Sequence, residues 1–488
     1  MPPWLAERGY GEFANDRSLT ERELSTLQQW IQEGAVEGDP ADGPKPPEFK
    51  DGWELGPPDL VVSMPKPYRL EASAPDIYYN VPIPVPITER KFVRAMEFHP
   101  GNPRIVHHAS IYFDPTRESR RAAARANAQG FEAMQPPESA STVAGQMLGW
   151  EPGKRPERYP PGKSWPLEKN TDLLLQLHLH STGKSEEVKS EVGFYFTEQP
   201  PTNTPFLLRV PEWRIDIPAG ATNYVIENSF TLPIDVDVLR ISPHAHYLAH
   251  DMQCVAILPD GGKKWLLWIR DWNFNWQGDY QYKQPVSLPK GAKVTMRFTY
   301  DNSAANPRNP NSPPKRVRFG PQTTDEMAQI ALQVMPRNPA ERQTLASELF
   351  KKMTLDAIAY NESLLAENPN DAKAHAKIGQ ALLPLGRYQE ALKHLNAANR
   401  LDPTNDKVHY DLGVLLMAFG QFENAEREFK QAIRLNPDDY QAHGNLASVY
   451  LRMNNAAKAE EHFREALRLN PDDAVARKAL EALVRDGK

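Results

Sequence analysis

The spacing of apolar and polar residues changes twice along this chain. Residues 20–34 carry apolar side chains three and four positions apart, which predicts one short amphipathic helix. From about residue 50 to 336, short apolar runs separated by Pro- and Gly-rich loops predict β-strands. After about residue 337 the apolar spacing is helical to the end. The pattern therefore predicts a multidomain chain, in which β-rich domains precede an all-α domain.

The strand-rich part divides into two blocks, residues 50–199 and 200–336. Each contains several strand candidates, which predicts two antiparallel β-sandwich domains of the jelly-roll type. Asp260-Gly261-Gly262 predicts a tight hairpin turn between two strands of the second block. The strand candidates are residues 92–98, 105–113 and 173–180 in the first block, and 224–230, 238–242, 253–258, 265–269 and 294–300 in the second.

The last domain, residues 337–488, contains a sequence repeat. Prolines recur every 34 residues, at Pro369, Pro403, Pro437 and Pro471, and alanines recur with them at Ala391, Ala425 and Ala459. This period is typical of tetratricopeptide repeats, whose paired helices stack into a solenoid that holds a protein or peptide in its groove. We expect three full repeats, a degenerate helix over 340–368 before them and a final helix over 472–486.

Histidines also follow the repeat. His375, His409 and His443 occupy one slot on the first helices, where we expect them to pack between helices. His394 and His462 lie on the second helices and are predicted to be solvated.

Composition excludes several classes of protein. The 488 residues carry 57 basic and 63 acidic side chains, a net charge of −6, which disfavours a nucleic-acid partner. No apolar run approaches the ~18 residues that a membrane span requires. Cys254 is the single cysteine, so the chain is free of internal disulfides and has no Cys-based zinc or haem site.

The clearest candidate chemistry lies in histidine pairs within the strand-rich part. His244 and His246 are two residues apart in a strand-like run, so both imidazoles point from one face. His107 and His108 are adjacent and need a bulge or turn to share one ion. His178 precedes His180 in the same way that His244 precedes His246. Convergent imidazoles indicate a copper, zinc or iron site, and a methionine thioether would favour Cu(I).

Six motifs in this order resemble one enzyme family. They are V-H-H-A-S-I-Y-F-D (106–114), L-L-L-Q-L-H-L-H-S-T-G-K (173–184), P-H-A-H (243–246), D-W-N-F-N-W-Q (271–277), T-Y-D-N-S-A-A-N-P-R-N-P (299–310) and G-P-Q-T-T-D-E-M (320–327). Residues 50–336 thereby resemble the copper type II, ascorbate-dependent monooxygenases, which include peptidylglycine α-hydroxylating monooxygenase and dopamine β-monooxygenase. The chain is most similar to their bacterial branch.

The resemblance implies two copper ions per chain, one on each sandwich. The ligands carried over are His107, His108 and His178 at an electron-transfer site, and His244, His246 and Met327 at the oxygen-binding, catalytic site. His180 and His250 have no ligand counterpart in the family. The implied reaction is hydroxylation of an aliphatic C–H bond of a small molecule or peptide, with O₂ and a reductant such as ascorbate.

Two positions depart from the peptide-amidating members of the family. Ser242 stands where those enzymes have a substrate-binding arginine, and Ala331 stands where they have a tyrosine. A glycine-extended peptide is therefore not the expected substrate. Trp265, Trp268, Trp272, Phe274 and Trp276 could form a substrate platform, but sheet packing explains their spacing more simply.

The sequence is also compatible with two other functions. The first is a catalytically inactive scaffold that binds copper and a protein partner. The second is a zinc hydrolase that uses the same histidines, although the chain lacks an H-E-x-x-H motif to supply a carboxylate base.

Residues 1–49 resemble the C-terminal end of a bacterial c-type cytochrome domain. The similar text is M-P-P-W…F-A-N-D-R-S-L-T-E-R-E-L…W-I-Q-E-G-A…G-D-P, and Met1 stands where that family has an axial haem ligand. The C-x-x-C-H motif is missing, so haem binding is not carried over. We expect the natural chain to start upstream with a signal sequence, which predicts a periplasmic or exported protein; a cytoplasmic protein is the alternative.

Overall fold

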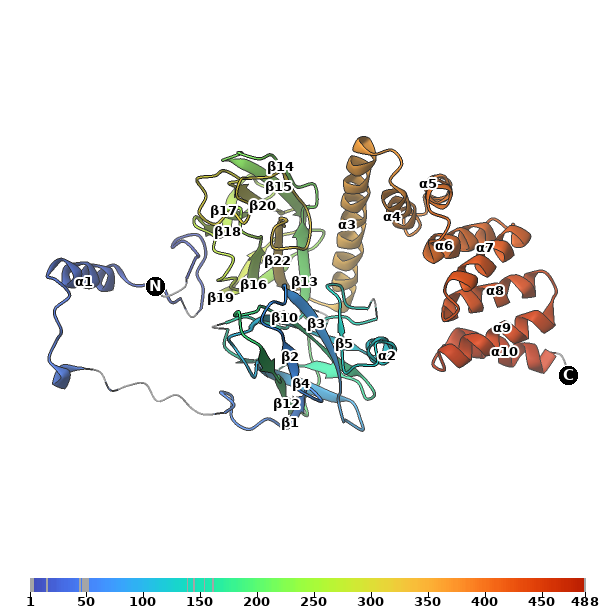
Figure 1. Cartoon of the computed structure of the whole chain (residues 1–488), viewed down its shortest axis with the longest axis horizontal. Coiled ribbons are helices and arrows are strands. Elements are labelled where there is room, and N and C mark those ends of the chain that lie inside the picture. The colour runs from blue at the N-terminus through green and yellow to red at the C-terminus, as the bar shows by residue number, and fades with distance from the viewer. Residues whose placement is uncertain are drawn as a thin grey trace. The chain divides into compact units, whose positions relative to one another are not determined.

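A computed structural model describes residues 4–14, 16–43, 45, 52–137, 139–143, 145–152, 154–159 and 162–486, coloured along the chain in Figure 1. The position of Met1 lies outside them. The chain forms two compact units, Met1–Leu349 and Phe350–Lys488, and the division falls within helix α3 (Pro339–Glu367). None of the helices in the described part of the chain has the length and apolar character that crossing a bilayer requires.

The first strand-rich region is built from antiparallel sheets. Its elements are β1 (Leu60–Ser63), β2 (Tyr68–Leu70), β3 (Ile77–Pro84), β4 (Lys91–His99), β5 (Val106–Asp114), α2 (Glu118–Arg125), β6 (Phe131–Glu132), β7 (Gly149–Trp150), β8 (Glu157–Arg158), β9 (Trp165–Leu167), β10 (Asp172–Leu179), β11 (Glu186–Val188) and β12 (Glu191–Thr197). One sheet has the order β1-β12-β4-β8 with β9 beside β4, a second has β6-β3-β10-β5-β7, and β11 pairs with β2.

One apolar core joins the two larger sheets of this region. Leu175 of β10 and Val81 of β3 belong to the same buried cluster as Val93 of β4 and Phe194 of β12. The four alternate leucines of β10 from Leu173 to Leu179 belong to that cluster too. Because side chains alternate along a strand, Gln176 and His178 of β10 lie on the opposite face of their sheet, away from this core.

The second strand-rich region also consists of antiparallel sheets. Its strands are β13 (Phe206–Pro211), β14 (Asp216–Ile217), β15 (Tyr224–Thr231), β16 (Val236–His244), β17 (Ala249–Ile257), β18 (Lys263–Ile269), β19 (Tyr280–Leu288), β20 (Lys293–Tyr300), β21 (Val317–Arg318) and β22 (Gln329–Met335). The sheets have the orders β13-β22-β16-β19, β15-β20-β17-β18 and β14-β21. The expected hairpin turn at Asp260–Gly262 joins β17 to β18. Antiparallel strands are thus confirmed in both blocks, and jelly-roll connectivity stays a prediction.

The N-terminal stretch contacts the second region before its own helix begins. Ala6 forms a β-bridge with Ile269 and Phe13 forms one with Tyr282. The expected helix is α1 (Glu21–Gln32), and Thr20 caps it in the predicted capping box with Glu23. A short 3₁₀ turn, η1 (Pro40–Asp42), follows.

The second unit is helical, as the 34-residue period predicted. Its helices are α4 (Ala372–Leu382), α5 (Tyr388–Leu401), α6 (Asp406–Ala418), α7 (Phe422–Leu435), α8 (Tyr440–Arg452), α9 (Ala456–Leu469) and α10 (Ala474–Asp486). They pack in the pairs α4 with α5, α6 with α7, and α8 with α9. Helix α3 covers the expected degenerate helix and α10 the expected final one.

Helices α6 and α7 approach closely because Gly413 lacks a side chain. A Cβ atom at Gly413 would lie 2.7 Å from Cε1 of Phe429, which is fully buried and cannot move aside. Gly444 is also helical, but a Cβ atom there would meet nothing within 4 Å.

We predict opposite effects of the same substitution at these two glycines. Gly413→Ala should lower the free energy of unfolding by about 1–3 kcal/mol because the new methyl overpacks the interface. Gly444→Ala should raise it by up to about 1 kcal/mol through better helix propensity. Urea unfolding followed by far-UV circular dichroism measures both changes, and equal effects of the two substitutions would contradict this packing.

The sequence predicted that His394 and His462 are solvated, but both are half-buried in the structure. Nδ1 of His394 lies 3.0 Å from Nδ1 of His375, and Nδ1 of His462 lies 3.0 Å from Nδ1 of His443. The sequence-based prediction was wrong because the repeat places each pair across the contact between two helices. Burial is the main cause that lowers the pKa values of both His443 and His462 below the usual imidazole value.

These lowered pKa values predict that acid destabilises the repeats. Below pH ~6.5 the unfolded imidazoles take up protons that the folded pair resists, so stability falls as the pH falls through that value. The melting temperature should therefore drop between pH 7 and pH 5, and less in the His443→Gln/His462→Gln double variant. An equal drop in both proteins would rule out this pair as a source of the acid sensitivity.

Candidate metal centre

A bulge in β5 brings His107 and His108 to the same side of their sheet. His108 lies opposite His178 of β10, but the next pair along the ladder is Val106 with Leu179, so His107 is an extra, unpaired residue. The bulge that two adjacent histidines required is therefore present. It places both imidazoles beside the imidazole of His178.

The three imidazoles converge on one point through their Nδ1 atoms. Nδ1 of His108 lies 3.2 Å from Nδ1 of His107 and 3.3 Å from Nδ1 of His178. Ligands about 2.0 Å from an ion in tetrahedral directions are about 3.3 Å apart. The donor atoms thus have the spacing of a single transition-metal site.

Burial keeps these imidazoles neutral. It lowers the pKa of His107 to about 4, that of His108 to about 3 and that of His178 to about 2, and neighbouring imidazoles lower them further. Their lone pairs are therefore available near neutral pH, when a cation can take them. Tyr78 stacks on His178 with 4.3 Å between ring centroids.

Asp76 is a functional candidate that the sequence did not reveal. Its Oδ1 lies 2.9 Å from Nδ1 of His180, and its Oδ2 lies 3.6 Å from Nε2 of His178. Nε2 of His178 has no hydrogen-bond partner among the described residues, although the side chain is fully buried. A carboxylate beside the second nitrogen of a ligand histidine orients the ring. Asp76 directly precedes β3, and β3 pairs with β10, which carries His178. The proximity of Asp76 to His178 therefore depends on the sheet order.

The second predicted pair, His244 and His246, lies at the end of β16. Nδ1 of His244 lies 2.7 Å from Oε1 of Gln277, and Nδ1 of His246 lies 3.1 Å from the carbonyl oxygen of Asp325. Both partners are acceptors, so these contacts favour the tautomer that carries the proton on Nδ1 and the lone pair on Nε2. Burial lowers the pKa of His246 to about 3 and that of His244 in the same direction.

The backbone of Met327 lies close to that of His246. The ladder between β16 and β22 ends at His244 opposite Gln329. Beyond it, the N–H groups of His246 and Met327 both donate to Oε1 of Glu326. The backbone of Met327 is held at both ends, because its N–H donates to Glu326 Oε1 at 2.8 Å and its carbonyl accepts from Tyr300 Oη at 2.8 Å.

Glu326 ties the methionine strand to the histidine strand. Its fully buried carboxylate accepts backbone N–H bonds from His246, from Leu248 at 2.9 Å and from Met327 at 2.8 Å. Burial raises the pKa of Glu326 to about 8, although these hydrogen bonds lower it. The D-E-M motif contained this residue, but its role depends on amides that lie about 80 positions away in the sequence.

The remaining candidates have other surroundings. His250 lies in β17, where its backbone carbonyl accepts from the N–H of Trp272. Trp265 and Trp268 stack on each other and both contact Tyr10, so they pack the N-terminal stretch instead of forming a platform around the histidines.

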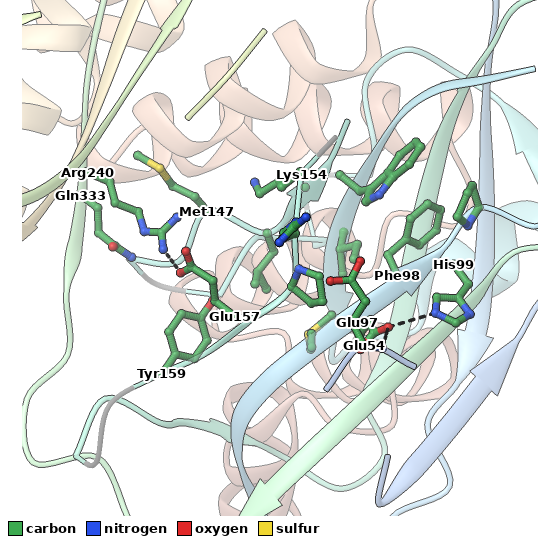
Figure 2. Close-up of a pocket in the computed structure, with 18 of the residues that line it drawn as sticks. Glu54, Glu97, Phe98, His99, Met147, Lys154, Glu157, Tyr159, Arg240 and Gln333 are labelled. Atoms are coloured by element: carbon green, nitrogen blue, oxygen red, sulfur yellow. Dashed lines mark hydrogen bonds and ion pairs between the residues drawn. The ribbon is translucent and has the colours of Figure 1, made fainter. Parts of the chain in front are cut away.

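A cavity of about 320 Å³ lies between the two strand-rich regions. Figure 2 shows Arg240 and Gln333 of the second region beside Glu157 and Tyr159 of the first in the cavity lining. Arg240 forms an ion pair with Glu157. None of the six predicted ligands is among the described residues that line this cavity.

Comparison with known proteins identifies the helical part. A family model described as tetratricopeptide repeat matches residues 410–474, and one described as TPR repeat matches residues 379–420. The C-terminal region therefore contains tetratricopeptide repeats, as predicted. No curated protein sequence matches the chain. The copper monooxygenase resemblance of residues 50–336 stays a prediction.

Solved structures resemble part of the chain. MamA is 20% identical over 31% of this chain and 86% of its own, with a TM-score of 0.27. YrrB, described as a TPR protein with an unusual peptide-binding site, is 23% identical over 29% and 75%, with a TM-score of 0.26. The first TPR of Spaghetti, bound to an HSP90 peptide, is 19% identical over 24% and 91%, with a TM-score of 0.23.

The role of Glu326 gives a testable prediction. Glu326→Ala leaves three backbone N–H groups without their acceptor in a buried site, which should cost about 2–4 kcal/mol of unfolding free energy. Glu326→Gln keeps an oxygen acceptor and should cost less. Urea unfolding followed by tryptophan fluorescence separates the two, and an alanine variant as stable as the glutamine variant would contradict the role assigned to the carboxylate.

Proposed function

We propose that this protein is a two-copper monooxygenase that hydroxylates an aliphatic C–H bond with O₂ and a reductant such as ascorbate. The observation that carries the proposal is the convergence of three neutral imidazoles, one fully buried and two half-buried, through the bulge at His107. Two further imidazoles, at and just after the end of β16, supply a second donor set of different composition. The ordered sequence motifs support copper as the metal of both sites.

The two donor sets suit different tasks. Three imidazoles, from His107, His108 and His178, accept copper in both oxidation states, which suits electron transfer. His244, His246 and the thioether of Met327 favour Cu(I), the state in which oxygen binds. Bound copper supplies the one-electron chemistry by which one oxygen atom enters the C–H bond and the other leaves as water, with two electrons from the reductant and two protons.

The protein's own residues keep each donor in its correct form. Gln277 and Asp325 hold the protons of His244 and His246 on Nδ1, which directs both Nε2 lone pairs to the metal. Asp76 places a carboxylate 3.6 Å from Nε2 of His178 and 2.9 Å from Nδ1 of His180. Glu326 fixes the distance between His246 and Met327 through backbone N–H bonds.

The substrate class follows in part from β16 and β22. Ser242 and Ala331, at the positions where peptide-amidating relatives carry arginine and tyrosine, are direct cross-strand partners. This pair offers small side chains and no cation, so it does not hold a substrate carboxylate. We infer a substrate that is not a glycine-extended peptide.

The repeats supply a second activity, the binding of a protein or peptide partner in a solenoid groove. If the copper sites bind metal without turnover, the protein is instead a copper-binding scaffold in which the repeats carry the function. An exported location remains our expectation for a copper protein of this kind.

Copper titration and oxygen uptake test the proposal. Purified protein should bind about two copper ions per chain and consume O₂ in the presence of ascorbate. Met327→Ile should abolish uptake while the histidine-only site keeps its copper, as measured by metal analysis and by electron paramagnetic resonance (EPR) of Cu(II). His250→Gln is the matched control and should keep both copper ions and activity.

Each other outcome rejects a defined part of the proposal. Full activity of the Met327 variant removes the thioether from the reaction. Tight copper binding without oxygen uptake favours the scaffold, and selective zinc binding with hydrolysis favours the hydrolase.

A further inference from the structure

One aromatic ring, Phe274, contacts both histidine groups. Its centroid lies 5.6 Å from that of His107, nearly parallel to it, and 5.5 Å from that of His246, nearly perpendicular to it. Phe274 belongs to the second strand-rich region, whereas His107 belongs to the first. The two imidazole centroids are therefore no farther apart than the sum of these two distances, and Phe274 contacts both imidazoles.

The segment that carries Phe274 is anchored on both sides of it. The indole N–H of Trp272 donates to the carbonyl oxygen of His246 at 3.0 Å. Gln277 accepts from His244, and Arg308 bonds Asp271 at the start of the segment at 2.8 Å. The position of the ring is thus fixed by the same residues that hold the second histidine pair.

Burial excludes water from the place where the ring lies. Phe274 is 4% exposed, and Tyr247 covers it with 4.6 Å between ring centroids. Aromatic pairs at these separations make direct contact. The contacts of Phe274 with His107 and His246 therefore provide a path through the packed atoms of one side chain.

We propose that Phe274 is a positioning residue that sets the separation of the two copper sites and carries the electron between them across its ring. This inference rests on the proposed function, since it needs copper at both sites. His107, His108 and His178 would hold the copper ion that gives up one electron. His244, His246 and Met327 would hold the copper ion that accepts the same electron.

Four variants test the role of the ring. Phe274→Ala removes the ring and opens a space that water can enter, Phe274→Leu fills part of the volume without a ring, and Phe274→Tyr keeps the ring. Trp276→Leu is the matched control, because Trp276 lies in the same segment but is 41% exposed. Copper content is measured first for every variant, so that loss of a site is distinguished from loss of coupling.

Two measurements on copper-loaded protein do not depend on turnover. Pulsed EPR gives the separation of the two Cu(II) ions. Injection of one electron from a photochemical reductant, followed by rapid-freeze EPR, gives the rate at which the electron moves between the sites. We expect Phe274→Ala to broaden the distribution of copper–copper separations. The same substitution should slow electron transfer roughly 10- to 100-fold, as a small loss of alignment does.

We expect Phe274→Leu to slow transfer as well, and Phe274→Tyr and Trp276→Leu to match the wild-type protein. Wild-type separation and rate in Phe274→Ala, or a wild-type rate in Phe274→Leu, would overturn the inference although both sites still bind copper. Failure of the wild-type protein to bind two copper ions would instead reject the proposed function itself.

Discussion

One extra residue in strand β5 is the constraint on which the candidate metal centre depends. Adjacent residues in a regular strand face opposite sides, so His107 and His108 could not meet without the bulge. His178 faces the bulge from β10, and the leucines of that strand pack into the core on the other side of the sheet. The rigidity of the leucine-filled sheet therefore holds three imidazoles together before any metal binds.

A second constraint joins the methionine strand to the histidine strand. His246 follows β16 and Met327 precedes β22, and these two strands pair in one ladder that ends at His244 and Gln329. The buried carboxylate of Glu326 accepts backbone N–H bonds from both segments, which fixes their separation without using either metal-binding side chain. Phe274 then connects this second group to the first.

Much of this arrangement was predictable from local sequence. The 34-residue period predicted the helical repeats, and the H-H pair predicted a bulge, because each depends on residues that are close in the chain. The roles of Asp76, Gln277 and Glu326 were not found, because each contacts a histidine that is distant in the sequence. His462 was misassigned for the same reason: its partner His443 lies across a helix pair, 3.0 Å away.

Anomalous X-ray scattering from a crystal of the copper-loaded protein tests the central claim most directly. The account predicts two copper peaks, one bound by Nδ1 of His107, His108 and His178, and one bound by Nε2 of His244 and His246 with the sulfur of Met327. A single peak, or copper bound away from these six side chains, would contradict it.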